Sequence, residues 1–339
     1  MTADLQIPTL DDVAKAAGVS TATVSRCLNA ADKVSDHART KVMQAVETLG
    51  YTPNFGARAM AAKRTFTIGA IIPTMENAIF ARAIQAFQES LHEKGYTLLV
   101  SSSAYRADLE AEQIRALVAR GADGILLIGY ARDQEMYDYL KRRGVPTLVA
   151  WASPQEALAP AVGFDNRAAI FALADKVLSM GHRRIGFIST VLRGNDRAAE
   201  RLKGVRDALV AHGVDPEEMQ VVETTNVLEN GGHAFAKIMQ GPRRPTVVMC
   251  GNDVLAVGAA QRAHEMGLRV PEDVSITGFD DMELACVITP KLTTVHVPHR
   301  DMGSRAAVEL VRMVEKESTG LSVELDSSLR MRASLRALD

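Results

Sequence analysis

Apolar residues near the N-terminus recur with the period of an α-helix. The stripe at spacing i, i+3, i+4 and i+7 consists of Leu10, Val13, Ala14 and Ala17. Thr9 precedes this stripe and Asp12 follows it three residues later, which is the spacing of a capping box. Gly18 is expected to end this short helix, because glycine readily adopts the left-handed conformation that a helix end needs.

A second short helix is predicted directly after the glycine turn. Ser20 can cap it, and Val24 and Leu28 fall on the face that packs against the first helix. The opposite face carries small or polar side chains, namely Thr21, Ala22, Ser25 and Arg26. Two short helices joined by a glycine turn are typical of a helix-turn-helix, whose second helix enters the DNA major groove. Taken alone, the pattern also fits any small helical hairpin.

A third helix is predicted to begin after Ser35 and to end at Gly50. Its apolar face consists of Val42, Ala45, Val46 and Leu49. The three helices together predict a small core, which is marginal in stability at this size. That core would contain Leu10, Val13, Val24, Leu28, Val42 and Leu49.

From Phe66 onward the pattern changes to short apolar runs that alternate with helical stretches. The first block has apolar runs at 67–72, 97–100, 124–128 and 146–150, with helices expected at 80–94, 109–119 and 134–142. The second block has apolar runs at 184–188, 221–223, 246–250 and 274–279. Such alternation predicts an α/β fold with parallel sheets covered on both faces. Two blocks and a return strand near 294–297 predict two doubly wound lobes, with ligands bound in the crevice at the carboxyl ends of the strands.

Length and composition are typical of a globular protein of two or three domains. The chain has 339 residues, of which 47% are hydrophobic. No charged-then-apolar leader is present, and the apolar runs are shorter than the ~20 residues of a membrane helix. Cys27, Cys250 and Cys286 are widely spaced, which argues against a disulfide framework or a zinc cluster and fits a reducing cytoplasm. Cys27 is expected to be a small packing residue.

The charge distribution along the chain is only weak support for DNA binding. Residues 1–64 hold eight Lys/Arg and six Asp/Glu, whereas the whole chain has a net charge of −2. The excess of positive charge in the first part points toward an N-terminal DNA-binding head, but it is small.

Catalytic and metal-binding patterns are missing from the sequence. It has no G-x-S-x-G elbow, no H-E-x-x-H and no phosphate-binding G-x-x-x-x-G-K-[ST]. The eight histidines are scattered, and His296 and His299 flank Pro298 without a third metal ligand nearby in the sequence. We therefore expect no catalysis, no metal ion and no cofactor.

The stretch T-L-D-D-V-A-K-A-A-G-V-S-x-x-T-V-S-R at 9–26 closely resembles the start of the LacI/GalR family of bacterial transcription regulators. The resemblance continues through AVGFDN (161–166), GHRRIGFI (181–188), the run at 250–281 and PKLTTVHVP (290–298). It covers the chain from Thr9 to about Arg332. It implies a helix-turn-helix head at 1–53, a hinge at 54–64 and a periplasmic-binding-protein-like core at 65–339. In that core the N-lobe would span about 65–163 and 296–330, and the C-lobe about 164–294.

The resemblance assigns DNA contacts to the second helix. Base contacts are expected from Thr21, Ala22 and Arg26, and arginine can grip guanine with two hydrogen bonds. Ala22 would touch a thymine methyl or nothing. Phosphate or capping contacts are expected from Ser20, Thr23, Ser25 and Asn29. The remaining candidates for DNA contact are Thr9, Asn54, Ala57 and Met60.

The segment at 54–64 matches the family's hinge helix, which enters the minor groove as a dimer pair. Asn54 matches its first residue, and Met60 matches the position of the apolar wedge that kinks DNA. The alternative is a flexible linker at 56–64. The segment can be a linker in the free protein and a helix on DNA. So short a segment is not stable as a free helix, and Gly56 weakens it further. We expect the hinge to fold only on DNA.

Met60→Gly is therefore expected to weaken specific operator binding far more than nonspecific binding. A wedge acts only where the hinge pair inserts at the centre of an operator. Titration of an operator duplex and a scrambled duplex measures the two affinities. Equal losses on both duplexes would show that Met60 is not a wedge.

The effector pocket is assigned by the same resemblance. Arg201 matches an arginine that grips an effector oxygen or carboxylate, and Asp280 matches an aspartate that contacts a sugar or base. Asn252 matches a ligand amide. Asn195 and Arg197 are expected on the loop before Arg201, and Phe80 in a loop after the first strand, where the family places an aromatic near the ligand.

Alternative roles remain open for several of these residues. Arg201 can instead pair with Glu200 or Asp196 at the surface. Phe80 fits the core as well as the pocket. We expect Asp253 to be a helix cap and Asp165 to hold loops together across the cleft.

Trp151, the only tryptophan, stands where some sugar-responsive family members carry an aspartate. A tryptophan there favours stacking on a ring over a hydrogen bond to a hydroxyl. Arg197 together with Arg201 favours an acidic effector such as a sugar acid.

The sequence as a whole predicts a cytoplasmic, dimeric transcription regulator, with a repressor favoured over an activator. It would bind a palindromic operator in double-stranded DNA and respond to a small ligand, a sugar or sugar acid, in the cleft. No leucine-heptad tail follows Leu329, so a dimer is expected. The alternatives are a purine-type regulator that needs a corepressor and a cytoplasmic small-molecule-binding protein without DNA function.

Overall fold

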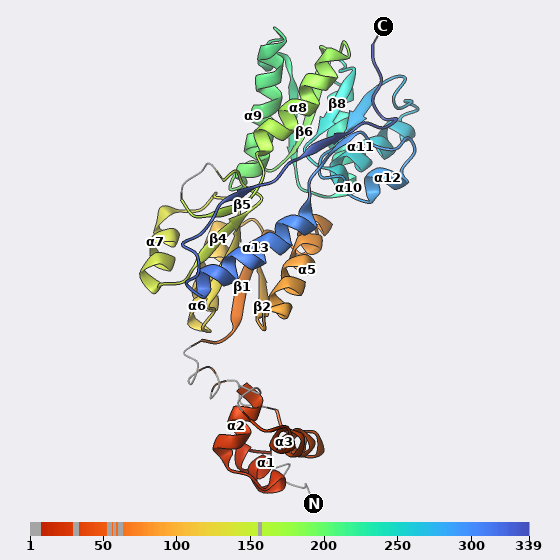
Figure 1. Ribbon diagram of the computed structural model, residues 1–339. Coiled ribbons are helices and arrows are strands. Elements are labelled where there is room, and N and C mark those ends of the chain that lie inside the picture. Colours follow the sequence, from red (N-terminus) through yellow and green to blue (C-terminus); the bar gives the residue numbers. More distant parts are fainter. Residues whose placement is uncertain are drawn as a thin grey trace, which may run out of the picture. The chain divides into compact units, whose positions relative to one another are not determined.

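The computed structural model describes residues 8–29, 34–52, 56, 59, 64–154 and 158–338. The chain divides into two compact units, residues 1–65 and 66–339 (Figure 1). Asn54, Ala57 and Met60 lie outside the described residues. Among the described residues, no helix combines the length and the hydropathy that crossing a bilayer would require.

The smaller unit packs three helices around one apolar cluster. They are α1 (Leu10–Ala17), α2 (Thr21–Asn29) and α3 (Asp36–Leu49). The predicted caps are confirmed: Thr9 and Asp12 form a capping box, and Ser35 caps α3. Gly18 and Gly50 end their helices with positive φ angles of 65° and 61°. Tyr51, which the sequence pattern did not place in the core, is buried with the helices.

The larger unit contains two lobes, each built on its own parallel sheet. The N-lobe sheet has the strand order β11-β5-β4-β3-β1-β2. Its strands are β1 (Thr67–Ile72), β2 (Thr97–Ser102), β3 (Gly124–Ile128), β4 (Thr147–Ala150), β5 (Ala161–Gly163) and β11 (Val323–Glu324). On one face lie α5 (Ala78–Glu93) and α13 (His299–Val314), and on the other α6 (Ala107–Ala119) and α7 (Gln134–Arg143) (Figure 1).

The C-lobe sheet has the order β7-β6-β8-β9. Its strands are β6 (Ile185–Thr190), β7 (Gln220–Thr224), β8 (Val247–Cys250) and β9 (Ser275–Thr277). On one face lie α8 (Asn166–Ser179) and α9 (Asp196–Ala211), and on the other α10 (Leu228–Met239) and α11 (Asp253–Glu265) (Figure 1). Two short helices, η2 (Pro216–Glu218) and α12 (Leu284–Val287), complete the lobe. The predicted α/β class with two doubly wound lobes is confirmed.

The return strand differs from the expectation. β10 (Thr294–His296) joins neither large sheet as a full strand but pairs antiparallel with β12 (Ser328–Arg330). The chain after β12 then runs along the C-lobe, where Ile276 donates its N–H to the Ser334 carbonyl at 2.9 Å. The C-terminal segment is therefore part of the C-lobe packing.

Candidate DNA-binding helix and effector cavity

The two faces of α2 differ as the sequence predicts. Val24 and Cys27 are buried in the head, so Cys27 is indeed a packing residue. Ala22 and Arg26 are exposed, and Thr21 and Ser25 are half-buried. The exposed face thus presents a guanidinium and small side chains, the combination that lets a helix approach base edges closely.

Hydroxyl groups at the helix starts are engaged in capping. The Ser20 Oγ accepts a hydrogen bond from Thr23 N at 3.2 Å and lies 2.9 Å from Thr23 Oγ1. The Thr9 Oγ1 donates to the Asp12 carboxylate at 2.7 Å, and this bond lowers the pKa of Asp12. Asn29 is the last residue of α2. These hydroxyls cap the first turns of α1 and α2.

All the predicted effector residues line one cavity between the two lobes, which we call the inner cavity. Its wall consists of Asn77, Ile79, Phe80, Tyr105, Trp151, Thr190, Asn195, Arg197, Arg201, Asn226, Asn252 and Asp280. Many of these follow the carboxyl ends of parallel strands, which is where doubly wound sheets bind ligands. The cavity has a volume of about 20 Å³, room for about one water molecule.

Arg201 is buried in this wall. Its Nη1 donates to the Asn166 Oδ1 at 2.9 Å, and its guanidinium lies 4.8 Å from the centre of the Phe279 ring. The alternative of a surface ion pair with Glu200 or Asp196 is wrong, because Arg201 is buried while these carboxylates pair with Lys203 and Arg197, respectively. Burial lowers the pKa of Arg201, and the nearby Asp280 partly offsets that effect.

Asp280 faces the same cavity with an unusual backbone. It has a φ of 103°, a conformation that costs free energy and tends to occur at ligand-binding positions. Its Oδ2 is buried and has no hydrogen-bond partner among the described residues. Burial raises the pKa of Asp280 to about 7, although the charge of Arg201 acts in the opposite direction.

Asn195 is the last loop residue before α9, as expected, whereas Arg197 lies in the first turn of that helix and not on the loop. The Asn195 Oδ1 caps the helix by accepting from Ala198 N at 3.3 Å. Arg197 is buried, and its Nη1 donates to the Ile128 carbonyl of the N-lobe at 3.1 Å. Arg197 therefore joins the two lobes across the cleft.

The capping role expected for Asp253 is wrong, because the preceding residue, Asn252, is the helix cap. Asn252 caps α11, with its Oδ1 accepting from Leu255 N at 2.9 Å. Asp253 instead accepts from Thr294 Oγ1 and Met282 N, each at 2.6 Å. Burial, with the charge of Asp280, raises the pKa of Asp253 to about 8.

Asp165 also departs from its expected role. Its side chain accepts from Arg167 N at 2.8 Å and from Ala168 N at 2.9 Å, so it caps α8. The prediction that it holds loops together across the cleft is wrong. A carboxylate that accepts two backbone N–H groups at a helix start is fixed within its own lobe.

Phe80 and Trp151 form the aromatic part of the wall. Phe80 lies in the first turn of α5, not in a loop, and its ring centre is 5.3 Å from that of Trp151 in an edge-on arrangement. Both rings are buried, so Phe80 belongs to core and cavity wall at once. Trp151 has a φ of 61°, and its carbonyl accepts from the Asn166 amide at 2.9 Å. Asn166 thus links Trp151 to Arg201.

Sequence reasoning missed further polar residues of the wall. They are Asn77, Thr190 and Asn226, and each lies at or after the carboxyl end of a strand. Ligands of doubly wound sheets bind at such ends, so strand position was the signal that could have found these residues. Asn226 Oδ1 is buried without a hydrogen-bond partner among the described residues. The donors Trp151 Nε1 and Arg201 Nε are likewise buried without a partner among these residues. Together with Asp280, the cavity wall offers two unpaired donors and two unpaired acceptors.

Comparisons with known proteins agree with both units. The model "Bacterial regulatory proteins, lacI family" matches residues 9–54, and "Periplasmic binding protein-like domain" matches residues 174–335. Catabolite control protein A of Priestia megaterium is 32% identical, over 97% of this chain and 99% of that protein. The HTH-type transcriptional repressor PurR of Escherichia coli is 34% identical, over 96% of each chain.

This chain belongs to the LacI family. A solved structure of the lac repressor dimer, bound to operator and the anti-inducer ONPF, superposes with a TM-score of 0.87. It is 26% identical and covers 98% of this chain and 100% of that one. As a LacI-family protein, the chain is a DNA-binding transcription repressor with a helix-turn-helix head and a ligand-binding type of core.

Near the inner cavity, the burial of His299 is expected to make the stability of this LacI-family core dependent on pH. It is buried 6.2 Å from the Trp151 ring, and burial lowers its pKa to about 4. A depressed histidine pKa means that the folded state loses stability as the pH falls from 6.5 toward 4. The loss amounts to about 3 kcal/mol of unfolding free energy.

We expect the variant His299→Phe to lose less stability than the wild type between pH 7.5 and pH 4.5. Urea unfolding at both pH values measures the difference, and other titrating groups cancel between the two proteins. His299→Leu serves as a second variant should the larger ring disturb packing. An equal loss in wild type and variants would show that the His299 pKa is not depressed.

Proposed function

We propose that this LacI-family protein is a dimeric repressor that binds a palindromic operator through α2. A sugar or sugar acid that enters the inner cavity would lower or raise its affinity for the operator. The protein would act in the cytoplasm on double-stranded DNA, and the proposal assigns it no catalysis. The observation that best supports a ligand at this site is the set of unpaired, buried polar atoms in the wall of the inner cavity. Leaving a buried donor or acceptor unpaired costs about 1–3 kcal/mol, which a ligand with matching groups recovers.

Hydroxyl groups fit this set because each can donate and accept. Trp151 Nε1 and Arg201 Nε require acceptors, whereas Asn226 Oδ1 and Asp280 Oδ2 require donors. A sugar presents several hydroxyls around one ring, so it satisfies both kinds at once. Arg197 and Arg201 additionally favour a carboxylate on the ligand.

Binding in the inner cavity is expected to move the lobes. A cavity of about 20 Å³ does not hold a sugar, so the walls must separate. The walls are tied together by contacts between lobes: Arg197 with the Ile128 carbonyl, Asp196 with Tyr130 N, and Arg82 with Glu283. A ligand that breaks or reforms these contacts changes the lobe angle. It alters operator affinity only by as much as its affinities for the DNA-bound and free forms differ.

A ligand panel tests the proposal. Thermal unfolding is measured with neutral sugars, their aldonic acids and purine bases, and hits are followed by calorimetry. A sugar or sugar acid is expected to raise Tm, since a ligand that binds only the folded state stabilises it. Stabilisation by purines alone would replace the proposal with the purine-type alternative, which the Phe80–Trp151 pair favours because flat rings pack against aromatic side chains.

A further inference from the structure

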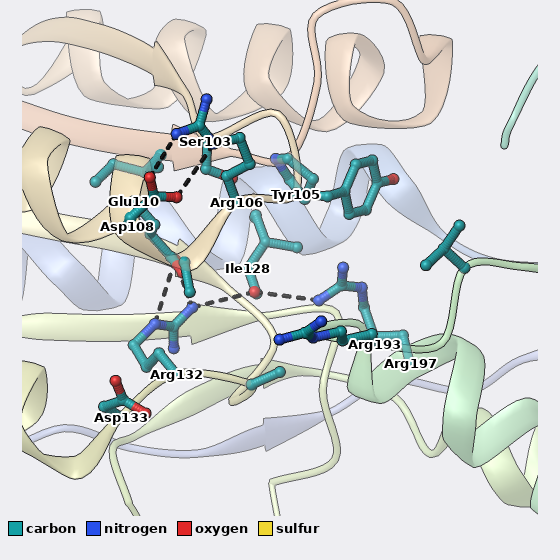
Figure 2. Close-up of a pocket in the computed structure, with 16 residues that line it drawn as sticks. Ser103, Tyr105, Arg106, Asp108, Glu110, Ile128, Arg132, Asp133, Arg193 and Arg197 are labelled. Atoms are coloured by element: carbon teal, nitrogen blue, oxygen red, sulfur yellow. Dashed lines mark hydrogen bonds and ion pairs between the residues drawn. The ribbon is translucent and has the colours of Figure 1, made fainter.

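The inner cavity adjoins a larger hollow, of about 660 Å³, which we call the outer hollow (Figure 2). Its N-lobe wall comes from the end of β1 and the segments after β2 and β3. Its C-lobe wall comes from the loop between β6 and α9 and from the first turn of α9. Tyr105 and Arg197 line both spaces. The two spaces are therefore neighbouring compartments of the same cleft between the lobes.

Tyr105 is held between the two compartments by a strained segment. Ala104 and Tyr105 have φ angles of 50° and 57°, and two successive non-glycine residues in this region are costly. Arg106 N donates to the Ser103 carbonyl at 2.9 Å, which closes the turn. Tyr105, Arg197 and Arg201 line the inner cavity together. Burial raises the pKa of Tyr105, and the charges of Arg197 and Arg201 oppose this shift. The strained turn positions Tyr105 where the two compartments meet.

Most charges of the outer hollow are already neutralised within its wall. The Arg132 Nη2 contacts Glu110 at 3.0 Å (Figure 2). The Arg132 Nη1 donates to the Gly129 carbonyl at 2.7 Å. Arg106 pairs with Asp108. Within the part of the chain that the structure describes, no ion pair engages Arg193 or Asp133, which lie on opposite lobes.

This wall suits an uncharged, hydroxyl-rich ring better than a phosphate. A phosphate needs an excess of free cationic groups, whereas here one unpaired arginine is balanced by one unpaired aspartate. Planar guanidinium and carboxylate groups offer donors and acceptors to hydroxyls, and Tyr105 offers an aromatic surface. The open volume lies within the range of small-molecule sites.

We propose that the outer hollow is a second subsite, which binds an uncharged second sugar unit of a di- or oligosaccharide whose first unit occupies the inner cavity. The inference rests on the proposed function, because it takes the inner cavity as the effector site. Tyr105 contacts the linkage region, and Arg193 and Asp133 hydrogen-bond the outer unit. The effector of this repressor is thus longer than one sugar ring.

Calorimetry with matched ligand pairs tests the second subsite. The pairs are cellobiose and glucose, maltose and glucose, and lactose and galactose. At least one disaccharide is expected to bind ten or more times tighter than its component monosaccharide. The double variant Arg193→Ala/Asp133→Ala is expected to reduce the disaccharide affinity to the monosaccharide level and to leave monosaccharide affinity unchanged. Arg243→Ala, which removes an exposed arginine of the same lobe, is the matched control.

The inference is overturned if no disaccharide binds tighter than its monosaccharide, or if the double variant leaves the preference intact. Arg201→Ala separates this failure from failure of the proposed function, because Arg201 lines the inner cavity but not the outer hollow. Weakened binding in Arg201→Ala with no effect of the double variant rejects the second subsite alone. Unchanged binding in Arg201→Ala rejects the inner cavity as the effector site.

Discussion

Replacing Arg26 by alanine is expected to lower operator affinity by about 100- to 1,000-fold at fixed salt concentration, with a small effect on nonspecific DNA binding. A bidentate arginine–guanine contact contributes about 1–3 kcal/mol, and a dimer on a palindrome makes it twice. Arg26 is exposed on the face of α2 opposite Val24, so its removal leaves the head core intact. Titration of labelled operator and of a scrambled duplex gives both affinities.

The control for Arg26→Ala is Arg243→Ala, which removes the same charge from an exposed site in the core unit. The control is expected to bind both duplexes like the wild type. Circular dichroism checks that the head of Arg26→Ala remains helical. Equal weakening on operator and scrambled DNA would reduce Arg26 to a phosphate contact, because phosphate contacts carry no sequence information.

Replacing Arg201 by alanine is expected to lower effector affinity by about 10- to 100-fold and to abolish the effector's influence on operator binding. Hydrogen bonds to a charged group contribute about 1.5–3 kcal/mol, and Arg201 has an unpaired Nε at the cavity. Operator affinity without effector should stay near the wild-type value, since Arg201 lies in the core unit. Calorimetry measures the first effect, and operator titration with and without ligand measures the second.

Arg201→Ala also leaves Asp280 without its neighbouring positive charge, so the variant is expected to be less stable. Arg201→Lys restores the charge but not the planar fork, and it separates charge from geometry. We expect Arg201→Lys to recover stability without recovering full effector affinity. Undiminished affinity for neutral sugars in Arg201→Ala would contradict the assigned role.

The strands were predictable because most are continuous apolar runs. The runs at 67–72 and 124–128 match β1 and β3 residue for residue. β5, β11 and β12 are two or three residues long, too short to produce a period. Their pairing depends on distant segments, as in Val323 beside Val162, which a local pattern does not contain.

The candidate site was predictable in its residues but not in their partners. All the predicted effector residues line the inner cavity, yet the partner of Arg201 is Asn166, on another helix. The capping roles of Asn252 and Asp165 depend on where each helix begins, which propensity fixes only within a few residues. Tyr105 was missed because its position at the partition follows from two strained backbone angles.

Selection of bound duplexes from a random DNA pool tests the central claim, that this LacI-family protein is a repressor that recognises a specific DNA sequence through α2. Purified wild-type protein and Arg26→Ala are compared, each alone and with a mixture of sugars, sugar acids and purines. The account predicts that the wild type enriches a palindrome with a kinkable central step in at least one condition, and that Arg26→Ala loses bases in each half-site. A wild-type pool that stays random in both conditions would contradict the account.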